Sequence, residues 1–229
     1  MASRKQQASR ALRVALPVMA GYVGIGIPCG IMEHQIGMDA LMAFVVSMTF
    51  YSGAGQFMVP SMWLAGQPIG AIVASVSFVN TRQILYSAAF SRFFTHVRKR
   101  ATLLFSGTVT DESFGVNMAK FQEDSGWSAA ESTMVNVMCM TTWALANAIG
   151  VLVGGAIAIP TAIASFAMTS IFICLLAAQK ASAVNIVVII VSALGVFMCK
   201  SIGLAGPAIL LGAIAGVVAG LAFKAVRAS

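Results

Sequence analysis

Long apolar segments, separated by short charged ones, constrain this chain more than any other feature. The run VNIVVIIVSALGVFM, residues 184–198, contains no charged residue, and segments of similar character recur along the sequence. Only 9% of the 229 residues are charged and the mean hydropathy is +0.90, whereas a soluble domain has about a quarter of its residues charged. Such a chain cannot cover a globule with water-compatible surface, so we expect it to lie in a membrane.

The segments are continuous runs of apolar residues, whereas the strands of a membrane β-barrel alternate apolar and polar residues. Most of them approach or exceed the ~20 residues that a transmembrane helix needs. We therefore predict an all-α, polytopic integral membrane protein. The seven apolar blocks lie at about residues 11–32, 39–65, 69–95, 127–153, 160–179, 183–199 and 202–223.

One transmembrane domain, residues 1–229, accounts for all seven blocks. We divide it into a front half at about 11–95, a cytoplasmic connection at about 96–126 and a back half at about 127–225.

The connection contains one segment with helical periodicity. Phe114, Met118 and Phe121 recur at helical spacing, which predicts a short amphipathic helix with Thr110 or Asp111 as its cap. Further on, Ser128 to Glu131 fits a capping box at the start of the fourth block.

Basic clusters indicate how the blocks cross the membrane, because cytoplasmic loops carry an excess of Lys and Arg. One cluster is at the N-terminus and the other at Arg98, Lys99 and Arg100. Three single crossings would put the second cluster outside, so block 39–65 must return to its own side. We predict a re-entrant pair of half-helices that breaks at SGAGQ, residues 52–56. The result is about six full transmembrane helices plus this broken pair, with both termini cytoplasmic.

The predicted break is the first candidate binding site. Gly53 and Gly55, with Ala54 between them, can supply unwound backbone whose N–H and carbonyl groups face a substrate. Gln56 adds a side-chain amide. An alternative stays open, in which these small residues only let two helices approach closely.

The second candidate is a pair of polar residues within the third block. Asn80 and Arg82 lie near the middle of a run long enough to span the membrane. An arginine at that depth costs between about 3 and 15 kcal/mol if it faces lipid, so it must face a cavity or a partner. It is either a structural ion-pair residue or a guanidinium that binds an anionic group such as a carboxylate.

Two acidic residues are candidates for coupling or gating. Asp111 and Glu112, in TVTDESF, fall on the cytoplasmic side in the predicted topology. They can gate the site, pair with Arg82 or titrate as a proton-coupling site. A simpler alternative is that they are helix-start acids favoured by the helix dipole.

Other classes of site find little support. The cysteines lie singly in four different blocks, and His34 and His96 lie at membrane edges, so no metal site is expected. The net charge of +7 comes from residues at block ends, which argues against nucleic acid. Glycines 21, 24, 26 and 30 are expected to serve helix packing, not dinucleotide binding. We predict no catalytic residues and no cofactor, and do not expect an enzyme.

Several motifs resemble those of the AzlC/YgaZ family of branched-chain amino acid exporters. The matching pieces are PVMAGYVGIGIPCGI, YSGAGQF, VNTRQILYS, TDESF and SFAMTSIFICLL, in this order along most of the chain. The family's motifs carry over to the residues already singled out, namely Gly53, Ala54, Gly55, Gln56, Asn80, Arg82, Asp111 and Glu112. One position departs from the pattern, because many members have aspartate where this chain has Ser165.

The resemblance implies a secondary transporter in the bacterial cytoplasmic (inner) membrane. It would export leucine, isoleucine, valine and methionine with a small AzlD/YgaH-like membrane subunit. Without a nucleotide-binding motif, proton exchange is the expected energy source. Two other functions stay open: a channel or facilitator for small solutes, and a non-transporting membrane assembly subunit.

Overall fold

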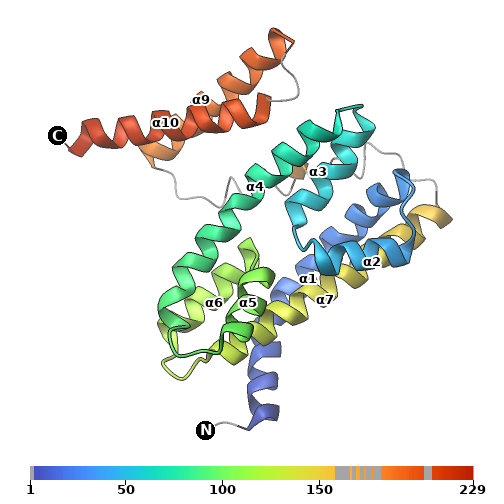
Figure 1. Ribbon diagram of the computed structural model, residues 1–229, viewed down its shortest axis with the longest axis vertical. Coiled ribbons are helices and arrows are strands. Elements are labelled where there is room, and N and C mark those ends of the chain that lie inside the picture. Colours follow the sequence, from blue (N-terminus) through green and yellow to red (C-terminus); the bar gives the residue numbers. More distant parts are fainter. Residues whose placement is uncertain are drawn as a thin grey trace. The chain divides into compact units, whose positions relative to one another are not determined.

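The computed structural model describes residues 3–157, 182–203 and 208–228, and also residues 166, 169, 170, 173 and 177. All regular elements in this part of the chain are helical, which confirms the all-α class (Figure 1). The main helices are α1 (Arg4–Gln35), α2 (Ala40–Thr49), α3 (Gly53–Leu64), α4 (Ile69–Phe90), α5 (Lys99–Thr108), α6 (Asp111–Glu123), α7 (Ala129–Ala156), α9 (Ala183–Ser201) and α10 (Ala208–Ala228).

Three of the described helices, α1, α7 and α9, are long and apolar enough to cross a membrane. The predicted count of six full spans stays a prediction. The predicted block 160–179 lies outside the described residues except for the five isolated positions, and Ser165 lies outside them too.

The described chain forms two compact units. Unit 1 comprises Met1–Ser61 and Val79–Met168, and unit 2 comprises Met62–Phe78 and Thr169–Ser229. All candidate site residues fall in unit 1. In unit 2, α9 and α10 pack closely, since a Cβ on Gly195 would lie 3.1 Å from the Cα of Gly212.

Glycine contacts join α1 and α7 at the centre of unit 1, where the two helices run side by side (Figure 1). A Cβ on Gly30 would lie 2.0 Å from the carbonyl oxygen of Asn147, and one on Gly150 would lie 2.2 Å from that of Ile27. Such contacts leave no room for any larger residue. The packing role predicted for the glycines of block one is therefore confirmed for Gly26 and Gly30.

Gly21 and Gly24 do not share that role within the part of the chain that the structure describes, because a Cβ on either would meet nothing there within 4 Å. For these two glycines the packing role stays a prediction.

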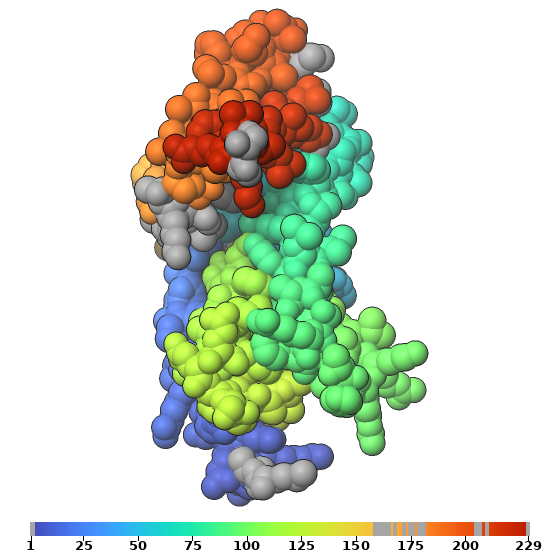
Figure 2. All heavy atoms as spheres, turned by 90° about the vertical axis from the view of Figure 1, so that its left-hand side faces the viewer, coloured from blue at the N-terminus to red at the C-terminus, as the bar shows by residue number. Residues whose placement is uncertain are grey.

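The connection between the two halves folds into α5 and α6. Helix α6 confirms the predicted amphipathic helix, and Thr110 caps it with a capping box that includes Ser113. Its residues Phe114, Met118 and Phe121 pack on a buried cluster formed by Phe90, Phe94, Phe105 and Val109. Figure 2 shows α6 and the C-terminal half of α4 adjoining on one face of the molecule.

The start of α7 also follows the prediction. Ser128 caps this helix and Glu131 completes the capping box. The Nε of Arg10, from α1, lies 3.3 Å from the buried Oε1 of Glu131, and its Nη2 lies 2.6 Å from Asp124 Oδ2. These ion pairs attach the N-terminal turns of α1 to the beginning of α7.

Candidate functional site

Block 39–65 is broken into two half-helices, α2 and α3, of 10 and 12 residues. A break in this block is confirmed, but it lies at residues 50–52 and overlaps the predicted break, residues 52–56, only at Ser52, so its centre lies three residues earlier. At a rise of ~1.5 Å per residue, each arm is about 15–18 Å long, roughly half of the hydrocarbon thickness.

The glycines themselves are not unwound. Gly53 and Gly55 lie in the first turn of α3, and neither has a positive φ. The reason is that Ser52 caps this helix: its Oγ accepts from Gly55 N–H at 3.1 Å. A Cβ on Gly55 would lie 2.8 Å from that Oγ and 2.9 Å from the Phe50 ring. Gly55 therefore leaves room for the side chains of the break itself, and these contacts do not show the close approach of two helices that was the alternative.

Helix α4 holds the break from one side. The Oγ of Ser52 donates to Asn80 Oδ1 at 2.6 Å, and the Nε2 of Gln83 donates to the Tyr51 carbonyl at 3.3 Å. Asn80 and Gln83 are three residues apart, so both lie on the same face of the helix. This face positions the unwound residues between the half-helices.

Arg82 lies on a different face of α4, directed at α6. Its Nη2 lies 2.8 Å from Asp111 Oδ2, and the hydroxyl of Tyr86, one turn further along α4, donates to Asp111 Oδ1. The side chains of Arg82 and Asp111 are 30% and 25% exposed, so the ion pair is only partly shielded. The Nε of Arg82 is buried and has no hydrogen-bond partner among the described residues.

The sequence analysis left the partner of Arg82 open, and the structure pairs it with Asp111. Asn80 contacts the break and Arg82 contacts α6, so α4 joins the two candidate sites through two of its faces.

Tyr22 connects the start of α6 to the break. Its hydroxyl bonds Thr110 Oγ1 at 2.7 Å and donates to Glu112 Oε2 at 2.8 Å. Its ring meets those of Tyr51 and Trp143 edge-on, with centroids 6.5 and 5.2 Å away. Glu112 is therefore bound to α1, whereas its neighbour Asp111 is bound to α4.

Gln56 lies in a separate buried network. Its Nε2 donates to Glu33 Oε1 at 3.0 Å and to Ser47 Oγ at 2.7 Å, and its Oε1 accepts from Trp143 Nε1 at 2.7 Å. The side chain is 2% exposed. Both amide hydrogens are committed, so Gln56 joins four helices (α1, α2, α3 and α7) and does not present a free amide.

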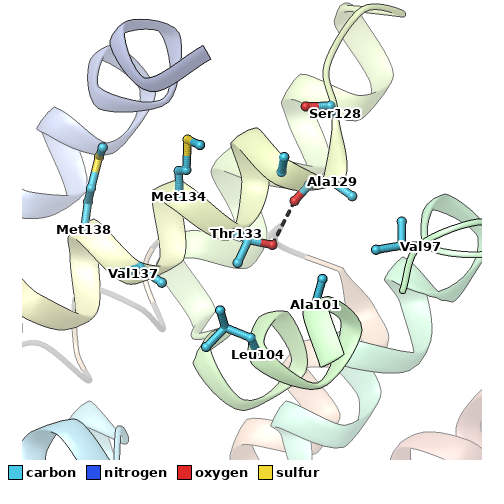
Figure 3. Close-up of a pocket in the computed structure, with 10 residues that line it drawn as sticks. Val97, Ala101, Leu104, Ser128, Ala129, Thr133, Met134, Val137 and Met138 are labelled. Carbon is cyan, nitrogen blue, oxygen red and sulfur yellow. Dashed lines mark hydrogen bonds between the residues drawn. The ribbon is translucent and has the colours of Figure 1, made fainter. Parts of the chain in front are cut away.

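A separate apolar groove of about 680 Å³ lies between α5 and α7. Figure 3 shows Val97, Ala101 and Leu104 facing Thr133, Val137 and Met138 across it. The Thr133 hydroxyl donates to the Ala129 carbonyl at 2.8 Å and so is satisfied within its own helix. No predicted site residue lines this groove, which separates it from the candidate site.

Several residues in these networks escaped the sequence analysis. Tyr86 lies four residues after Arg82, and Gln83 lies three after Asn80, so helical spacing from the chosen residues would have found both. Glu33 continues the packing face of Gly26 and Gly30 at helical spacing. Tyr22 and Trp143 carried no such signal, because aromatic residues are ordinary in apolar blocks.

In chemical terms, the Arg82 and Asp111 pair places a cation and an anion side by side within a largely apolar bundle. The same two charges occur in an amino acid zwitterion, in which carboxylate and ammonium groups are adjacent. A guanidinium binds carboxylates through parallel N–H donors, and Arg82 keeps one buried N–H unused among the described contacts.

Comparisons with known proteins agree on one family. The profile of the family described as "AzlC protein" matches residues 17–157. The chain is 28% identical over 162 residues to the "Branched-chain amino acid transport protein AzlC" of Bacillus subtilis (strain 168), covering 69% of this chain and 62% of that protein. It is 26% identical over 144 residues to the "Inner membrane protein YgaZ" of Escherichia coli (strain K12), covering 61% and 58%.

A third relative is an "Uncharacterized membrane protein" of Helicobacter pylori (strain ATCC 700392 / 26695), 27% identical over 171 residues that cover 74% of each chain. The matches therefore span less than two thirds of the length of the first two relatives. No solved structure was found to match this chain.

Proposed function

The chain belongs to the AzlC family of membrane proteins, and from this premise we propose that it is a secondary exporter of branched-chain and related apolar amino acids. The proposed substrates are leucine, isoleucine, valine and methionine. The name of the Bacillus subtilis relative, a branched-chain amino acid transport protein, supports leucine, isoleucine and valine.

One observation carries the proposal within this chain, namely the ion pair between Arg82 and Asp111. We infer that a zwitterion inserts between these side chains, its carboxylate on the guanidinium and its ammonium on the Asp111 carboxylate. The 2.8 Å contact and the partial exposure of both side chains support such an exchange. Opening the pair costs little net free energy, because the substrate replaces each lost charge with another.

We propose that the break, which Asn80 of the same helix contacts, would supply the remaining contacts of the site. Asn80 and the start of α3, Gly53 to Gly55, would orient the carboxylate through an amide and through the positive end of the helix dipole. Gln56 holds α3 in place and is not proposed as a direct contact.

Energy for export would come from proton exchange across the bacterial inner membrane, with both termini in the cytoplasm. A small AzlD/YgaH-like membrane subunit is the proposed partner. The Escherichia coli relative is named an inner membrane protein, which supports this location.

The test is uptake of labelled leucine into inverted vesicles that contain the chain with and without the small subunit. We expect saturable, stereoselective uptake that Arg82→Ala and Asp111→Asn each abolish. The matched control is Arg100→Ala, an exposed arginine on α5, which should transport normally. Normal uptake by Arg82→Ala at normal membrane abundance would refute the site, and solute-independent ion current in place of counterflow would indicate a channel.

A further inference from the structure

Glu33 is a buried carboxyl group that the proposed substrate site does not use. It lies near the end of α1 and is 2% exposed. Its Oε1 accepts one hydrogen bond, from Gln56 Nε2 at 3.0 Å. Its Oε2 is buried and has no hydrogen-bond partner within the described residues.

The charges around Glu33 do not neutralise it. No described lysine, arginine or histidine forms an ion pair with it. The helices packed against it contribute polar but uncharged groups: Ser47 from α2, Gln56 from α3 and, through Gln56, Trp143 from α7. The titratable groups at this end are Cys29 and His34 on α1 and Asp39, which caps α2.

A buried carboxylate without a cation is costly, and ionisable groups that persist in membrane segments commonly mark proton or ion pathways. A hollow of about 600 Å³ lies at the same end of α1 and is lined by His34 and Asp39, among others. Glu33 itself does not line this hollow, but its neighbour in the chain, His34, does. The predicted topology places this end outside.

Gln56 connects Glu33 to the proposed substrate site. It is the fourth residue of α3, and its backbone N–H bonds the Ser52 carbonyl at 2.8 Å. A hydrogen bond to a charged acceptor is about twice as strong as one between neutral groups. Neutralising Glu33 therefore weakens the bond that holds the first turn of α3, next to the break that Asn80 positions.

From these contacts we propose that Glu33 is the proton-binding site of the exporter. A proton from the outer side adds to Oε2 and forms the neutral acid. The hydrogen bond from Gln56 to Glu33 then weakens, and the α3 end of the break moves. The same proton later leaves Oε2 toward the cytoplasm as the carrier resets. This inference rests on the proposed function, because it assigns the coupling step to Glu33 in place of Asp111 or Glu112.

The test compares Glu33→Gln with wild type in proteoliposomes, in two assays. We expect Glu33→Gln to lose leucine flux driven by a pH gradient, down to the level of liposomes without protein. Leucine counterflow, which needs no net proton movement, should persist. The matched control is Glu123→Gln, which removes an acid that is 67% exposed on α6, and should behave as wild type in both assays.

The inference would be overturned if Glu33→Gln kept the gradient-driven leucine flux of the wild type. It would also be overturned if Glu33→Gln, present at normal abundance, lost counterflow to the same extent as gradient-driven flux. Infrared difference spectra between acidic and alkaline pH provide a readout that does not depend on transport. We expect a carboxylic acid band in wild type that shifts in Glu33→Asp and persists in Glu123→Gln. An unchanged band in Glu33→Asp would also overturn it.

The two assays separate this inference from the proposed function. If wild-type protein transports no amino acid, the proposed function fails, while the infrared titration still decides whether Glu33 binds a proton.

Discussion

Asp111 shows how one residue satisfies two explanations that the sequence left as alternatives. As the first residue of α6, it lies where the helix dipole favours negative charge. It also pairs with Arg82 and accepts from Tyr86. The helix start and the guanidinium of Arg82 both favour an acidic side chain at this position, which suits a group that is proposed to receive the ammonium of a substrate.

Buried amides give a residue-scale prediction about stability. Asn117 Nδ2 donates to Asn136 Oδ1 at 2.9 Å, Asn136 Nδ2 donates to the Phe105 carbonyl at 3.4 Å, and both asparagines are fully buried. Asn136→Ala leaves buried groups on α5 and α6 unpaired, so we expect a loss of about 1–3 kcal/mol of stability. Thermal denaturation in detergent measures it.

The matched control for this pair is Gln122→Ala, an exposed amide on α6, which should leave the melting temperature unchanged. Equal melting temperatures for Asn136→Ala and wild type would contradict the prediction that these buried hydrogen bonds stabilise the fold.

At the residue scale, the sequence shows that a buried charged side chain needs a partner more readily than it shows which residue that partner is. Arg82 is conspicuous because an arginine in an apolar run is costly, and Asp111 was one of two possible partners. Glu33 drew no attention, because it precedes His34 and Gln35 at a block end where a solvated loop is ordinary. Only the packing of α2, α3 and α7 around it makes it buried.

Among the elements, the broken pair α2 and α3 was predicted from charge alone and then placed three residues too late. The bias of basic clusters toward the cytoplasm required an even number of crossings, which located the break in the correct block. The glycines misplaced it, since Gly is the usual residue for unwound backbone. A serine cap at Ser52 instead lets α3 begin at Gly53, so the glycines lie inside its first turn.

Helix α5 was missed, because KRATLLFSGT reads as part of a polar connection. Its amphipathic pattern is short, and burial of Phe105 against α4 and α6 stabilises it. Tertiary packing of this kind cannot be read from a ten-residue window.

The contact between α1 and α7 yields the prediction at the element scale. Gly30→Ala would bring a Cβ to 2.0 Å from a backbone oxygen of α7, which no side-chain movement can relieve. We expect the helices to separate, with a loss of about 1–3 kcal/mol or more of stability and lower membrane abundance. Thermal melting and quantitative immunoblotting measure these effects.

Gly21→Ala is the control on the same helix, because its Cβ would meet nothing within 4 Å. It should be neutral or stabilising by up to ~1 kcal/mol, since alanine favours the helix. If both variants behave alike, close packing at Gly30 does not hold the helices together.

For the whole molecule, the prediction concerns orientation in the membrane. Ala65 and Gln122 are exposed and, in the predicted topology, lie on opposite sides. In a variant without the native cysteines, a membrane-impermeant maleimide should label Ala65→Cys in intact cells. Gln122→Cys should react only after permeabilisation. If only Gln122→Cys were labelled in intact cells, the topology would be the opposite of the predicted one, and Glu33 would lie on the cytoplasmic side.

The glycine contact between α1 and α7 also has a consequence for how the protein is made. Gly30 and Gly150 are about 120 residues apart, so at roughly 5–20 residues per second α1 is synthesised ~6–24 s before its partner. During that interval Glu33 lacks first Ser47 and Gln56, and then Trp143. The nascent first helix must therefore remain in or near the translocation machinery with an uncovered acid until the seventh helix arrives to complete its surroundings.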